Sequence, residues 1–267
     1  MVAIKAGNGS QSLRLPRILC LHGGGTNANI FRAQCRVLKL HIATTFRLVF
    51  AEAPFLAPPG PGVASVYDSW APFKSWVVPP DNDYDGQHTD EAKAIENSLR
   101  AAMEDDDQCG ATGEWVGLLG FSQGARICAS LLLSQQMQQE TATPATNWRF
   151  AILLAGSGPL LVLNLQLPTA PARDDQSTAT MTGAPESALA SPVLELPTVH
   201  VHGLHDPGLP EHRNLLSQWC RPASTKLMEW DGDHRVPIKT KDVLALVTVI
   251  REVACETGVR INAGLSI

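Results

Sequence analysis

Residues 119–125 read LGFSQGA, and this stretch decides the fold that we expect for the chain. The pattern Gly-x-Ser-x-Gly stands between an apolar run, residues 115–119, and a segment whose small and apolar residues recur at helical spacing. A strand, a tight glycine turn and a helix in that order form a nucleophile elbow, which lifts a serine hydroxyl clear of the backbone. Ser122 is therefore the candidate nucleophile. The alternative is a strand-to-helix turn that carries an idle serine.

A serine nucleophile needs a histidine base and a carboxylate that holds the base in the correct tautomer. Two later segments, residues 197–202 and 226–230, are predicted strands, and Asp206 and His234 follow them in turn. Serine, acid and histidine in this order, each on a loop after a strand, are typical of α/β hydrolases. We therefore expect Asp206 and His234 to complete a triad with Ser122.

Simpler alternatives exist for both partners. Asp206 could begin a turn before Pro207, and His234 could be a surface histidine. Asp231 and Asp233 are weaker candidates for the acid because they stand too near His234 in sequence to reach the far side of its ring.

An oxyanion that develops during attack by Ser122 requires at least two fixed donors. The backbone N–H of Gln123, the residue after the nucleophile, is expected to be one. The second is expected from the first strand-to-helix turn, residues 22–26 (HGGGT), with Gly24 preferred over Gly25. Alternatively, these glycines serve only a sharp turn.

Strands and helices alternate along the chain, which predicts an α/β fold: a mostly parallel central sheet of about six strands with helices on both faces. The length of 267 residues suits a single domain, residues 1–267. The first predicted elements are a strand at residues 17–21, a helix at residues 30–40 and a strand at residues 47–51.

Two irregular segments interrupt this alternation. Residues 52–87 lack a regular period and are expected to shape the site as a long loop. Its aromatic side chains are expected to line an acyl pocket or else to pack the loop onto the body: Tyr67, Trp70, Phe73 and Trp76. Residues 168–192, rich in Pro, Ala, Thr and Ser, are predicted to be a mobile insertion, either a lid or a solvated surface loop.

Composition excludes several classes of partner. The net charge is −5, and the basic residues form no stripe that would bind nucleic acid. No apolar run is long enough for a membrane span, and no signal peptide is recognisable, so we expect a soluble, cytoplasmic protein. The cluster of His200, His202, His205 and Asp206 makes a zinc site conceivable, but two of these histidines share a buried strand. We therefore expect no metal and no cofactor.

In combination, these motifs resemble the fungal serine hydrolase family of the α/β-hydrolase superfamily. The resemblance rests on residues 21–25 (LHGGG), 53–55 (APF), 73–76 (FKSW), 120–124 (GFSQG), 196–203 (LPTVHVHG) with Asp206, and 232–234 (GDH). Residues 60–62 (GPG) and the 73–76 block look most like the stand-alone thioesterases of fungal polyketide synthase clusters, of the lovastatin-pathway type.

The resemblance implies hydrolysis of an acyl thioester or ester, with a polyketide thioester on a synthase carrier domain as the substrate. The alternatives are an acyltransferase or cyclase that uses the same triad, a general carboxylesterase, and a non-catalytic binding protein on the same fold.

Overall fold

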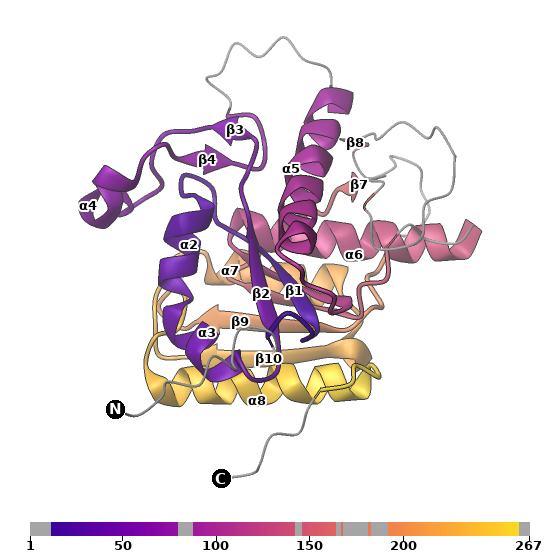
Figure 1. The fold of residues 1–267 in the computed structure, drawn as a ribbon. Coiled ribbons are helices and arrows are strands. Elements are labelled where there is room, and N and C mark those ends of the chain that lie inside the picture. Colours follow the sequence, from indigo (N-terminus) through magenta and orange to yellow (C-terminus); the bar gives the residue numbers. More distant parts are fainter. Residues whose placement is uncertain are drawn as a thin grey trace, which may run out of the picture.

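A six-stranded parallel sheet forms the centre of the molecule, in the order β10-β9-β6-β5-β1-β2 (Figure 1). The computed structural model describes residues 12–79, 88–141, 146–163, 167, 181–182 and 192–261. Every pairing in the sheet is parallel. The strands are β1 (Arg17–Leu21), β2 (Arg47–Ala51), β5 (Trp115–Phe121), β6 (Phe150–Leu154), β9 (Thr198–Gly203) and β10 (Thr225–Trp230). The predicted fold class is thereby confirmed.

Helices cover both faces of this sheet because successive side chains of a strand point to opposite sides. In β1, Ile18 and Cys20 join one hydrophobic cluster, whereas Leu19 and Leu21 join the other. The first cluster includes side chains of α2 (Ala28–Gln34), α3 (Arg36–Ile42) and α8 (Thr240–Glu256). The second includes side chains of α5 (His88–Gln108), α6 (Gln123–Thr141) and α7 (Leu209–Trp219).

The helix predicted at residues 30–40 is divided. α2 ends at Gln34, and α3 begins at Arg36 after a turn at Cys35. Phe31 of α2 and Leu38 of α3 both belong to the same hydrophobic cluster, and hydrophobic spacing alone does not reveal the break between the two helices.

The predicted long loop contains short elements as far as residue 79, where the described part ends. β3 (Phe55–Leu56) pairs antiparallel with β4 (Lys74–Ser75). Between them lie α4 (Ala64–Tyr67) and the 3-10 helix η1 (Asp68–Trp70), and in Figure 1 this arm projects from the body beside α2. A second 3-10 helix, η2 (Pro222–Ser224), precedes β10.

Most of the predicted insertion, residues 168–192, lies outside the described residues. Its described part includes the short strand β8 (Met181–Thr182), which pairs antiparallel with β7 (Val162–Leu163), a strand that precedes the insertion. Within the described part of the chain, no helix combines the length and the apolar character needed to cross a bilayer.

Candidate active site

Ser122 lies directly after β5, at the end of the sheet where the carboxyl ends of all the parallel strands lie. Its φ of +54° is rare for a residue with a side chain, and its N–H donates to the Leu154 carbonyl over 2.8 Å. Glycine is required on both sides: a Cβ at Gly120 would lie 2.4 Å from the Ala125 nitrogen, and one at Gly124 would lie 2.2 Å from the Leu21 oxygen. The strand, the strained serine and the helix α6 therefore form an elbow.

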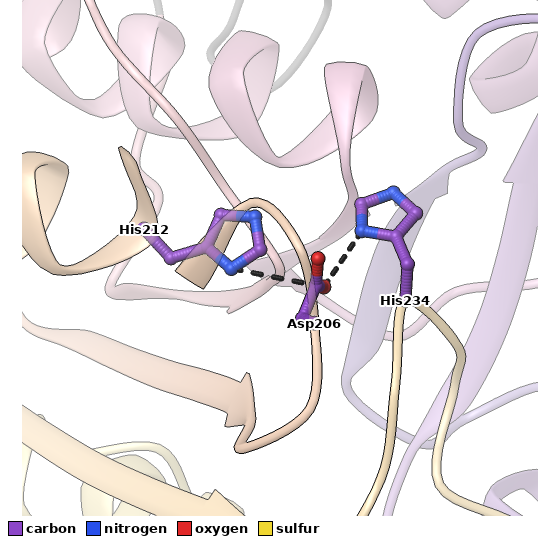
Figure 2. Close-up of side chains that lie close together, drawn as sticks. All are labelled: Asp206, His212 and His234. Atoms are coloured by element: carbon purple, nitrogen blue, oxygen red, sulfur yellow. Dashed lines mark hydrogen bonds and ion pairs between the residues drawn. The ribbon is translucent and has the colours of Figure 1, made fainter. Parts of the chain in front are cut away.

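Asp206 and His234 meet although they follow different strands (Figure 2). His234 Nδ1 lies 2.7 Å from Asp206 Oδ2, and Asp206 Oδ1 accepts a hydrogen bond from the Gly208 N–H over 2.8 Å. The carboxylate is buried, whereas 43% of the His234 side chain is exposed. A carboxylate in this position holds the proton of a neutral imidazole on Nδ1, which leaves Nε2 free to accept another.

Neither competing carboxylate contacts His234. Asp231 Oδ1 pairs with His205 Nε2 over 2.8 Å, and Asp233 pairs with Arg235 over 3.2 Å. Asp206 is therefore the carboxylate that can orient this imidazole.

Ser122 and His234 line the same cavity of about 620 Å³. Its walls come from the first strand-to-helix turn (Gly23 and Gly24), from the arm around α4 (Val63, Val66 and Tyr67) and from the loop after β10 (Arg235, Val236 and Ile238). A serine hydroxyl, an imidazole and backbone from a glycine turn thus face one space.

The glycine turn offers one clear candidate donor. The Gly25 N–H already donates to the Lys74 carbonyl over 2.8 Å, and Gly25 does not line the cavity, whereas Gly24 does. Gln123 is the first residue of α6, so its N–H has no acceptor one turn earlier in the helix. Gly24 and Gln123 therefore stay the candidate oxyanion donors.

The Gln123 side chain and Trp76 brace this turn. Gln123 Oε1 accepts from the Trp76 N–H over 2.7 Å, and the Trp76 indole N–H donates to the His22 carbonyl over 2.8 Å. His22 in turn accepts at Nε2 from the Ala53 N–H over 3.1 Å. The long loop, the elbow and the glycine turn are therefore held together by one hydrogen-bonded network.

The four aromatic residues of that loop have different environments. Tyr67 lines the cavity. Trp70, 43% exposed, packs against Tyr67 with ring centroids 5.5 Å apart, but it is not part of the cavity wall. Phe73 and Trp76 are buried and do not line the cavity either. Trp76 packs in the core, where its indole N–H donates a hydrogen bond to the His22 carbonyl.

The histidine cluster that suggested zinc does not assemble as a unit. His200 and His202 are buried in β9, whereas His205 is exposed and paired with Asp231. The group that does converge among the described residues is Asp206, His212 and His234. His212 was not a candidate from the sequence, because nothing in its local pattern shows that the first turn of α7 lies against Asp206.

The buried His200 predicts an acid sensitivity of the fold. Burial first, and then the neighbouring His202, lower the pKa of His200 from 6.5 to about 3. The unfolded chain binds this proton near pH 6.5 and the folded chain does not, so stability falls as the pH drops from 6.5 toward 3. We expect His200→Leu to lessen the decline in the free energy of unfolding from about pH 7 to pH 4.5, measured in urea. An equally steep decline in the variant would contradict this account.

Comparison with known proteins identifies the family of the chain. A family model described as serine hydrolase (FSH1) matches residues 12–246. The chain is 57% identical to esterase pigG of Monascus ruber over 93% of this chain and 94% of that protein. It is 50% identical to esterase dbaE of Emericella nidulans over 93% and 94% of the two chains.

Solved structures show the same fold at low sequence identity. Arabidopsis thaliana SOBER1 is 16% identical and aligns with a TM-score of 0.51 over 89% of this chain and 98% of its own. A carboxylesterase from Mesorhizobium loti is 14% identical and aligns with a TM-score of 0.51 over 92% of each chain. At this identity, the likeness concerns the fold alone.

Proposed function

The chain belongs to the FSH1 family of serine hydrolases, and from that membership we propose that it cleaves acyl thioesters or esters through an acyl-enzyme on Ser122. The observation that carries the proposal is the 2.7 Å contact of His234 Nδ1 with Asp206, beside a cavity that His234 shares with a serine on an elbow. Asp206 orients His234, and His234 Nε2 is the base.

The reaction has two half-steps. In the first, His234 Nε2 takes the Ser122 proton while Oγ attacks the acyl carbonyl, and the resulting imidazolium then protonates the leaving thiol or alcohol. In the second, His234 activates a water that releases the acid and restores the serine. The N–H groups of Gln123 and Gly24 stabilise the oxyanion in both steps.

The proposed substrate is a polyketide acyl chain held as a thioester on the carrier domain of a fungal synthase. The glycine and aromatic motifs at residues 60–62 and 73–76 support this class, as do fungal relatives that are named esterases. The cavity of about 620 Å³ suits an acyl chain because apolar side chains of the arm and of the loop after β10 line it.

Mass spectrometry of the chain after mixing with a panel of acyl thioesters and simple esters tests this function. We expect the acyl mass on the peptide that contains Ser122, and its loss in water as free acid. A fluorophosphonate probe should label the same serine. Acylation elsewhere, or no acylation by any member of the panel, would contradict the proposal.

Adding alcohols or amines to the same mixtures separates hydrolysis from transfer. A hydrolase forms free acid whether or not such acceptors are present. Products that carry the acceptor, or a cyclised chain, would identify an acyltransferase or cyclase instead. Turnover of simple esters without thioesters would indicate a general carboxylesterase.

A further inference from the structure

Three nitrogen and oxygen atoms beside the cavity lie close enough to share one cation. His212, in the first turn of α7, approaches Asp206 from the side opposite His234 (Figure 2). Its Nδ1 lies 3.8 Å from Asp206 Oδ2, and His234 Nδ1 lies 2.7 Å from the same oxygen. One ligand atom from each of the three residues lies within 4.8 Å of the others.

The two distances to Asp206 Oδ2, 2.7 and 3.8 Å, lie on either side of the distance between neighbouring ligand atoms of a zinc site. Bonds of about 2.0–2.1 Å in a tetrahedral arrangement place neighbouring ligand atoms roughly 3.3 Å apart. The distance of 2.7 Å must widen and the distance of 3.8 Å must shorten, each by about half an ångström. The hydrogen bond from the Gly208 N–H, 2.8 Å, ends on the other carboxylate oxygen, Asp206 Oδ1, so Oδ2 can bind a cation without competing for it.

His212 has a ring nitrogen, Nδ1, that is available to bind a cation. It is only 3% exposed, and its Nδ1 has no hydrogen-bond partner among the described residues. The serine mechanism proposed above does not use this side chain.

We propose that Asp206 Oδ2, His212 Nδ1 and His234 Nδ1 bind a divalent cation of the zinc class, and that its binding inhibits the enzyme. A carboxylate and two imidazoles suit Zn²⁺, and a fourth position remains for water. Ligation through His234 Nδ1 moves that ring's proton from Nδ1 to Nε2, with no proton gained or lost. With a proton on Nε2, His234 cannot accept the proton of Ser122.

Binding is tested first, without reference to activity. We expect calorimetric titration of ZnCl₂ into the intact Ser122→Ala chain to give one site per chain. Adding His212→Phe, which keeps a ring in the buried position, should weaken binding by roughly 10- to 100-fold or more. The matched control is His205→Phe, which removes the exposed histidine of the neighbouring His205–Asp231 pair and should leave the affinity unchanged. If His212→Phe does not fold, His212→Asn replaces it.

Inhibition is tested on chains that keep Ser122, by measuring hydrolysis of a chromogenic ester. The rate of each variant with zinc is divided by its own rate without metal. Zinc should inhibit, a chelator should restore the rate, and the half-inhibiting concentration should rise at least 10-fold in His212→Phe but not in His205→Phe. An equal response in both variants, or the absence of a zinc site by calorimetry, overturns the proposal. The inhibitory consequence rests on the proposed role of His234: zinc binding at the predicted site without inhibition would refute that role and leave the site standing.

Discussion

Ser122→Ala should lower kcat by roughly 10⁴-fold or more while leaving the fold intact. Without the hydroxyl, no acyl-enzyme forms, and only the cavity and the oxyanion donors remain to assist water. Alanine fits the elbow because its side chain is no larger than that of serine. The measurement is steady-state hydrolysis of a chromogenic ester, with thermal unfolding as the check on structure.

The matched control is Ser65→Ala. Ser65 lines the same cavity, but it is exposed on α4, and its hydroxyl donates to the Gly62 carbonyl over 2.7 Å. We expect a change of less than about threefold, since the variant loses one exposed hydrogen bond. Comparable losses in the two variants would mean that the Ser122 hydroxyl has no special role. A Ser122→Ala chain that still reacted with a fluorophosphonate probe would point to another nucleophile.

The central fold was predictable because its local signals agree with its packing. The inner strands β1, β5 and β6 are short, fully buried runs, mostly apolar. The elbow glycines stand where a Cβ would strike backbone, 2.4 Å from the Ala125 nitrogen at Gly120. The common edge at which parallel strands end also explains why Asp206 and His234 meet although 28 positions separate them. Strand order and loop position were enough to expect that meeting.

The surroundings of the site were less predictable because they depend on long-range packing. Trp76 reads as a pocket aromatic, but its indole N–H reaches the His22 carbonyl, 54 positions away, and the ring is buried. His212 gives no local sign that its ring lies 5.9 Å from that of His234. Hydrophobic spacing reports which face of an element is buried; it does not report which loop will cover it.

Asp206→Asn should be nearly as damaging, with a loss in kcat of roughly 10³- to 10⁴-fold and a much smaller change in KM. The asparagine amide can donate to His234 Nδ1. The imidazole then carries its own proton on Nε2, so Nε2 cannot accept the proton of Ser122. The hydrogen bond from the Gly208 N–H can still end on the amide oxygen, so the loop keeps its shape. The loss is therefore one of tautomer and of charge rather than of structure.

Asp231→Asn is the control that distinguishes this explanation from a general loss of negative charge near His234. Asp231 is exposed and pairs with His205 over 2.8 Å, so its removal takes a charge from the same loop without touching the Asp206–His234 contact. We expect kcat to change by less than about twofold, because exposed ion pairs contribute little. A large loss in Asp231→Asn with a small one in Asp206→Asn would transfer the role of the acid to Asp231, and the 2.7 Å contact of Asp206 with His234 would then need a purely structural explanation.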